Sequence, residues 1–197
     1  MSPISTRAAG LLGALSGSLA WGVLVLLDDF DIDYSLLPHD DVPIVQPLST
    51  IPGLVFGVVF GTALRRSRGI GAAPFLGYVL ASGLGYLAAY HAAFFTVLWL
   101  DRDHPNPDVL AWAMGGLLGG LAGSLVLGIA SKFLLRVPAA AVLGLPVVSG
   151  TLFGVLLLLV SFETEGHGVP KSLLVFFALW QGAYAFSLAP LLRTARA

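Results

Sequence analysis

Long runs of apolar residues, separated by short polar segments, form the dominant pattern along the chain. A helix needs about 20 mostly apolar residues to cross the hydrocarbon core of a bilayer. Runs of that length are continuous rather than alternating, which argues against the strands of a membrane barrel. The pattern therefore predicts an all-α integral membrane protein, a bundle of six transmembrane helices over roughly 8–27, 47–64, 73–99, 109–130, 138–160 and 172–192.

Composition supports the same class of protein. The chain is 57% hydrophobic and only 11% charged, whereas an ordinary soluble domain is about 25% charged. A soluble fold this poor in charge could not cover its own surface. The six runs fill most of the sequence, so we expect residues 1–197 to form a single membrane domain. The absence of cysteine excludes disulfides, dithiol redox chemistry and thiolate metal sites.

The first apolar run shares one feature with a signal peptide, because Arg7 precedes it. It is too long for a typical signal-peptide core, and no clear small-x-small cleavage site follows it. We expect this run to remain as a membrane anchor. The even number of predicted spans then puts both termini on the same side of the membrane.

Basic and acidic residues fall in different connections between the apolar runs. Eight of the ten basic residues share one side with the termini, and all eleven acidic residues share the other side with Arg102 and Lys171. Because basic residues near helix ends are retained in the cytoplasm, we expect a cell (inner) membrane protein with cytoplasmic N- and C-termini and external acidic loops. The eight residues are Arg7, Arg65, Arg66, Arg68, Lys132, Arg136, Arg193 and Arg196.

The six runs are arranged as three hairpins, and the hairpins share short sequence patterns. Each outward run ends in an apolar residue followed by acid-x-acid, at 30–33, 100–103 and 162–165. Each return run ends in a Leu-Arg step. The pattern indicates three repeated hairpins, although coincidence remains the alternative because Gly, Ser and Leu are abundant.

Small residues recur at every fourth position in several runs. Such faces let two helix backbones approach closely, which drives helix association in lipid. We expect a compact bundle with tight crossings, and the fourth run, with the longest small face, is the best candidate for a seam between copies. Pro146 should kink the fifth run. The expected packing residues are Gly53, Gly57, Gly61, Gly116, Gly120, Ser124, Gly128, Gly150 and Gly154.

No Asp, Glu, Lys or Arg lies within the predicted spans, but two stripes of uncharged polar residues do. Buried tyrosine hydroxyls and amides need hydrogen-bond partners. They either lock the helices together, which is common in membranes, or line a pocket for a small, mostly apolar ligand. His91 is the one ionisable residue at depth, where a functional role is the default hypothesis. The candidate pocket residues are Tyr78, Ser82, Tyr86, Tyr90, His91, Gln181, Tyr184 and Ser187.

The other three histidines lie one in each external connection, close to carboxylates. Imidazole and carboxylate together suit zinc, nickel, cobalt or manganese, so a divalent metal is one candidate cofactor. A solvated acidic rim explains the same residues. The candidate metal ligands are His39, Asp40, Asp101, Asp103, His104, Glu163, Glu165 and His167. The longest of these connections, 28–46, could also fold back as a lid, because loops of this length are often functional or disordered.

The pattern bears on three classes of function: membrane enzyme, solute transport or binding, and accessory subunit. No catalytic or nucleotide-binding motif occurs, so we expect no enzyme activity and no nucleic-acid partner. In size and layout the whole chain resembles the substrate-binding component of energy-coupling-factor vitamin transporters, which are small six-helix membrane proteins. The favoured reading is a small-solute or cation transport or binding component with a mid-membrane pocket between the third and sixth runs. The alternative is a structural or accessory subunit, or an oligomerising scaffold. The expected partners are the lipid bilayer and either a second copy or a membrane subunit.

Overall fold

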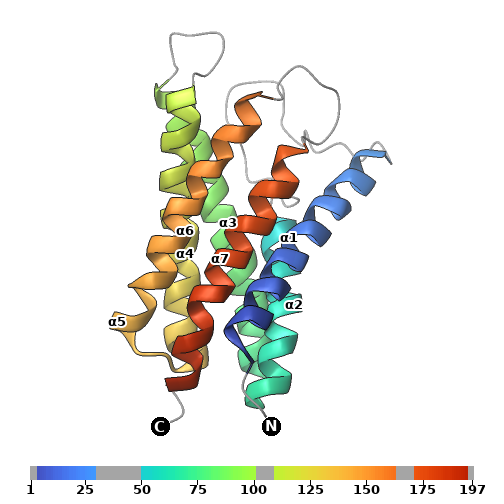
Figure 1. Ribbon diagram of the computed structural model, residues 1–197, viewed down its shortest axis with the longest axis vertical. Coiled ribbons are helices and arrows are strands. Elements are labelled where there is room, and N and C mark those ends of the chain that lie inside the picture. Colours follow the sequence, from blue (N-terminus) through green and yellow to red (C-terminus); the bar gives the residue numbers. More distant parts are fainter. Residues whose placement is uncertain (1–3, 30–49, 101–108, 163–170, 195–197) are drawn as a thin grey trace.

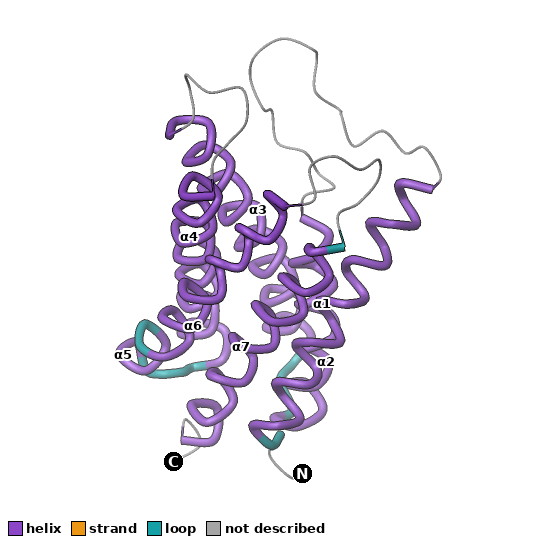
Figure 2. Tube along the Cα trace, turned by 45° about the horizontal axis from the view of Figure 1, so that its top comes forward, coloured by secondary structure: helices purple, strands orange, loops and turns teal. Residues whose placement is uncertain are grey.

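A computed structural model describes residues 4–29, 50–100, 109–162 and 171–194, and these residues are helical with no strand (Figures 1 and 2). The all-α prediction is confirmed for this part of the chain. The elements, in chain order, are α1 (Thr6–Asp29), α2 (Ile51–Arg68), α3 (Ala72–Leu100), α4 (Val109–Leu135), α5 (Ala139–Val142), α6 (Leu145–Gly154), the 3₁₀ helix η2 (Val155–Phe162) and α7 (Ser172–Thr194).

Five helical segments of the described ranges are long and apolar enough to cross a membrane: Thr6–Leu27, Ala72–Leu100, Val109–Leu135, Ala139–Leu157 and Ser172–Leu192. The predicted second span falls in α2. This segment is helical, but it is not among the helices that are long and apolar enough to cross a membrane. Its 18 residues include three arginines in the last turn. Length and composition thus support five membrane-crossing helices directly.

The fifth predicted span differs from the continuous, kinked helix that its hydropathy suggests. The helix breaks at Leu143 and Gly144, two residues before Pro146, and Gly144 adopts φ −81°, ψ −113°, outside the helical region. Pro146 then lies in the first turn of α6, where its missing N–H costs nothing. The irregularity therefore precedes the proline, and the chain tightens again into η2 from Val155.

The helices form a closed ring in which each packs against two neighbours. The order around the ring is α1, α2, α3, α4, α6, α7 and back to α1, with η2 extending α6 between α4 and α7 (Figure 2). The start of α1 and the end of α7 lie at the same end of the bundle (Figure 1). The end of α1 and the start of α7 lie at the opposite end of the bundle (Figure 1).

Glycines form the closest crossings in this ring. A Cβ atom on Gly116 would meet the backbone of Gly154, and one on Gly120 would meet the backbone of Gly150, so α4 and α6 touch backbone to backbone. Gly53 and Gly57 bring α2 equally close to α3. The crossing of α1 on α7 is just as tight at Gly13, which is not among the expected packing residues.

Two of the expected packing residues make looser contacts, and the seam between copies that we expected on α4 is not free. A Cβ on Gly61 would meet the side-chain rings of Phe75 and Tyr78 rather than backbone, and a Cβ on Gly128 would meet Val142 at an ordinary 3.4 Å. The small face of α4 that we expected to meet a second copy is covered by α6 of the same chain. That face is therefore already used within the bundle.

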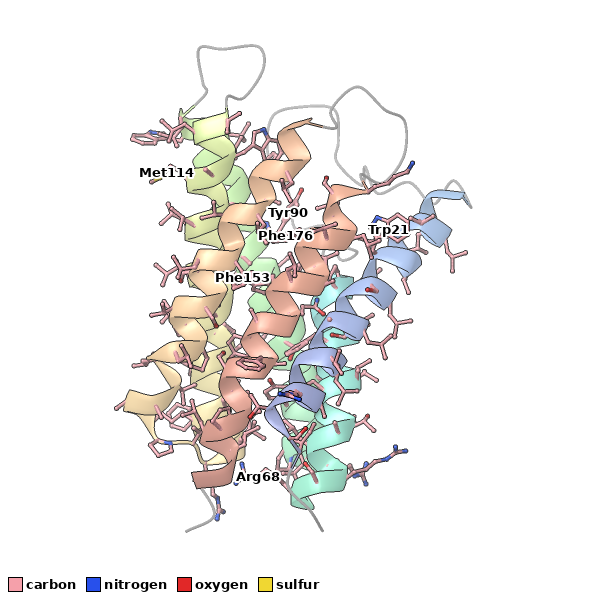
Figure 3. All side chains as sticks on the ribbon, in the orientation of Figure 1. Trp21, Arg68, Tyr90, Met114, Phe153 and Phe176 are labelled. Atoms are coloured by element: carbon pink, nitrogen blue, oxygen red, sulfur yellow. The ribbon has the colours of Figure 1, made fainter. Side chains whose placement is uncertain are left out.

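The outer surface of the bundle is lined by large apolar side chains. Leu11, Leu80 and Phe133 are 72%, 63% and 68% exposed, and many leucines on the other helices resemble them (Figure 3). Soluble monomers do not expose contiguous apolar surface on this scale. The surface is suited to contact with lipid chains.

Candidate ligand cavity

A small cavity lies between α3, α4, η2 and α7, in the half of the bundle away from the termini. Its volume is about 60 Å³. Figure 3 labels Tyr90 and Phe176, which lie close together on this side, whereas Arg68 marks the opposite end. The wall is formed by Tyr86, Ala89, Tyr90, Ala93, Gly116, Gly119, Gly120, Leu157, Phe176 and Trp180.

The local sequence explains why a space remains at this point. Tyr86 and Tyr90 are one turn apart on α3, and Phe176 and Trp180 are one turn apart on α7, so each pair shares a helix face. The α4 wall consists only of glycines, which leave unfilled volume opposite the rings. Large rings on two walls and no side chain on the third produce a cavity lined mainly by aromatic carbon.

Ring contacts and one hydrogen bond hold the aromatic residues in place. Tyr86 packs edge-on against Trp180, with ring centroids 6.3 Å apart, and Phe176 stacks on Trp180 at 6.2 Å. The indole Nε1–H of Trp180 donates to the carbonyl oxygen of Gly150 at 2.9 Å. Because this bond is buried, it fixes the orientation of the Trp180 ring.

Besides the Trp180 indole N–H, which is bonded to Gly150, the polar side-chain groups of the wall residues are the hydroxyls of Tyr86 and Tyr90. Neither hydroxyl makes a hydrogen bond to another described residue. The described part of the wall contains no Lys, Arg, Asp or Glu. The cavity therefore offers ring faces and two unoccupied hydroxyl groups to whatever enters it.

Gln181, one of the predicted pocket residues, locks three helices together instead of lining the cavity. Its Oε1 lies 2.7 Å from the Ser16 hydroxyl of α1, and its Nε2–H donates to the carbonyl oxygen of Pro52 in α2 at 3.1 Å. Gln181 itself is 1% exposed. This arrangement matches the interhelical role that the sequence left open as one of two readings.

Two predicted serines are likewise engaged in hydrogen bonds away from the cavity. The Ser187 hydroxyl donates to the carbonyl oxygen of Tyr184 at 2.8 Å and lies 3.0 Å from the Ser149 hydroxyl of α6. The Ser82 hydroxyl donates to the carbonyl oxygen of Tyr78 in its own helix at 2.7 Å. Both serines therefore satisfy their own polar groups within the bundle.

Tyr78 and Tyr184 meet in the other half of the bundle, close to the termini. Their hydroxyls are fully buried and have no hydrogen-bond partner among the described residues, and the same holds for Ser131 of α4. The Ser131 side chain is within interaction range of both tyrosine hydroxyls. The sequence patterns missed Ser131, although it continues the small face of α4 three residues after Gly128.

His91 lies next to the cavity residues in sequence but does not line the cavity. Its Nδ1–H donates to the carbonyl oxygen of Leu87 at 2.9 Å, and its ring packs against those of Tyr90 and Phe95. This bond assigns the proton to Nδ1 in the neutral ring, because a carbonyl oxygen can only accept. The hydrogen-bonding capacity of Nδ1 is therefore satisfied within the same helix.

Of the eight predicted pocket residues, the structure brings Tyr86 and Tyr90 to the cavity. Sequence reasoning missed Phe176, Trp180 and Leu157, although the i, i+4 spacing of Phe176 and Trp180 on the span that holds Gln181 was a usable signal. The eight predicted metal ligands lie outside the described residues, and so does the predicted lid at 28–46 except for Asp28 and Asp29, which end α1. Within those residues no group of three or more potential metal ligands occurs.

Fold and cavity together define a class: an all-helical membrane protein with several helices long and apolar enough to span the bilayer. Comparison of the chain with protein-family models, with curated proteins and with solved structures finds no match.

Proposed function

We propose that α2 is a sixth span, that the chain forms three out-and-back hairpins, and that both termini are cytoplasmic in a bacterial-type inner membrane. A helix of 18 residues is about 27 Å long, close to the thickness of the hydrocarbon core. The arginines of α2 gather in its last turn, where a span would meet the cytoplasmic interface. Lys132 and Arg136 lie at the end of α4 and just after it, at the same end of the bundle.

We propose that the protein binds a small, largely apolar solute in the cavity between α3, α4, η2 and α7, as the binding or transport component of a membrane system. The observation that carries this proposal is the aromatic wall of Tyr86, Tyr90, Phe176 and Trp180 around unfilled volume. Binding sites are typically apolar and aromatic clefts with a few polar groups. The tyrosine hydroxyls supply those polar groups here.

The competing accessory or scaffold role draws less support from the same observations. Its main argument was the small-residue faces, and the closest of these contacts lie between helices of one chain. Protein interiors are usually close-packed. A scaffold has no need for a cavity in a bundle whose helices otherwise pack backbone to backbone. A role in solute binding uses that cavity.

The test is native mass spectrometry of the protein purified gently from its own membrane, wild type beside two variants. Leu157→Phe adds a ring at the cavity wall, and Leu152→Phe makes the same change on the exposed surface one and a half turns away. We expect a stoichiometric small molecule on wild type and Leu152→Phe, and its loss from Leu157→Phe. Wild-type protein that carries no small molecule but holds a co-purifying subunit would support the accessory role instead.

A further inference from the structure

The cavity wall contains more aromatic surface than a purely apolar ligand would require. Four rings from two helices line a space of about 60 Å³, and the remaining wall is formed by small residues and Leu157. Leucine or valine would serve equally well to enclose a hydrocarbon. Aromatic faces differ from aliphatic side chains in carrying a negative quadrupole, which attracts a cation placed over the ring.

The other groups in the wall point to the same sign of ligand charge. The hydroxyl oxygens of Tyr86 and Tyr90 have no partner among the described residues, and each can accept a hydrogen bond from an N–H group. Among the described residues the wall contains no Lys or Arg, which would repel a cation and hold an anion. Ring faces also repel anions, which leaves a cation as the charged species that the wall favours.

With the proposed topology, the charge distribution along the chain attracts cations to the external side. All eleven acidic residues fall in the three sequence connections that we propose to be external, where Arg102 and Lys171 are the only basic residues. The clustered arginines of α2 lie at the other end (Figure 3). A one-signed field raises the local concentration of the opposite ion and speeds its association.

We infer that the cavity binds the ammonium head of a small organic amine, an inference that rests on the proposed solute-binding function and names its ligand class. The volume limits the bound group to a few heavy atoms, because the cavity offers about 60 Å³ and one water molecule needs about 10 to 15 Å³ in the same measure. A methylammonium or ethylammonium head fills such a space. Its positive charge lies against the rings, and its N–H groups donate to the tyrosine hydroxyl oxygens.

The experiment measures saturable binding of radiolabelled ethylammonium to the purified protein in an uncharged detergent, with unlabelled competitors. We expect ethylammonium to compete at least tenfold more strongly than ethanol, which has the same number of heavy atoms and no charge. Equal competition by ethanol would overturn the cationic ligand while leaving a solute cavity in place. Absence of binding by either compound would overturn this inference, and a bare wild-type mass spectrum would in addition remove the proposed function.

Variants of one ring separate the attraction of the aromatic face from simple filling of space. Tyr90→Phe keeps the ring and should retain ethylammonium binding within about threefold, whereas Tyr90→Leu should weaken it at least tenfold. Phe95→Leu removes an exposed ring from the same helix outside the cavity and is the matched control. An equal loss in Phe95→Leu and Tyr90→Leu, or no loss in Tyr90→Leu, would contradict the inference.

Discussion

At the scale of single residues, the buried polar groups divide into those with partners and those without. Gln181 bonds to two other helices, whereas the hydroxyls of Tyr78, Ser131 and Tyr184 have no partner among the described residues. A buried polar group with a partner contributes to stability, and one without a partner detracts from it. The two kinds of residue therefore respond in opposite ways to substitution by an apolar residue of similar shape.

Gln181→Leu should destabilise the protein. The change removes both hydrogen bonds of the side chain, to Ser16 and Pro52, which together connect α7 with α1 and α2. Interhelical polar bonds in membranes are worth about 0.6 to 2 kcal/mol each, so losing two of them should cost about 1 to 4 kcal/mol. Reversible unfolding in detergent measures it, and an unchanged free energy of unfolding would show that these bonds do not hold the helices.

Tyr184→Phe should leave the free energy of unfolding within about 0.5 kcal/mol of wild type, or raise it. The hydroxyl that is removed is fully buried and meets no geometric criterion for a hydrogen bond within the described residues, although Ser131 lies nearby, so its desolvation cost disappears with it. The ring and its packing against Phe56 remain. A loss above about 1.5 kcal/mol in the same assay would reveal a bound partner, such as a water molecule, at this hydroxyl.

Part of the residue-level picture was available from sequence. The four-residue spacing of Tyr86 and Tyr90 identified one wall of the cavity. The same kind of spacing did not separate wall residues from locking residues such as Gln181, because that depends on how each helix is rotated and which helix lies opposite. The sequence shows which residues share one face of a helix. Which other helix that face contacts depends on how the helices pack.

At the scale of elements, glycine contacts set how closely the helices approach. Gly154→Ala should destabilise the protein by about 1 to 3 kcal/mol, the usual cost of overpacking. Its new methyl group would lie against the backbone of Gly116 and 3.0 Å from the Cα of Gly120. Gly22→Ala on α1 is the matched control, since nothing lies within 4 Å of the added Cβ, and we expect it to be neutral or slightly stabilising. Equal effects of the two changes would argue against a tight α4–α6 crossing.

The helices themselves were largely predictable, and their interruptions were not. Continuous apolar runs located helices over all six predicted regions, because hydropathy records burial in lipid or protein. The break at Gly144 and the tightening at Val155 leave the hydropathy unchanged, so no apolar pattern marks them. Pro146 indicated the approximate position of the break. Because proline is well tolerated in the first turn of a helix, the break lies before Pro146 and not at it.

At the scale of the whole molecule, the ring order of helices is a result of packing that the sequence pattern does not contain. Lipid-facing and partner-facing apolar surfaces look alike in composition, so hydropathy does not say which helices are neighbours. The charge pattern does constrain orientation. It predicts that Ser5, before α1, and Ala73, at the start of α3, face the cytoplasm, whereas Lys171, before α7, faces outward.

Single cysteine variants measure this orientation cleanly, because the natural chain has no cysteine. In intact cells a membrane-impermeant maleimide should label Lys171→Cys, and should label Ser5→Cys and Ala73→Cys only after the membrane is permeabilised. Labelling of Ser5→Cys and Ala73→Cys from opposite sides would mean that α2 does not cross the membrane. The six-span proposal would then fail, although the ring of helices would stand.

The central claim is that the aromatic cavity between α3, α4, η2 and α7 holds a bound molecule. Its most direct test is an experimental density map of the protein in lipid nanodiscs, taken without added ligand after gentle purification and again with ethylammonium. The account predicts non-protein density bounded by Tyr86, Tyr90, Phe176 and Trp180 in at least the second map. The claim would be contradicted if both maps showed these side chains collapsed together, with no space left between them.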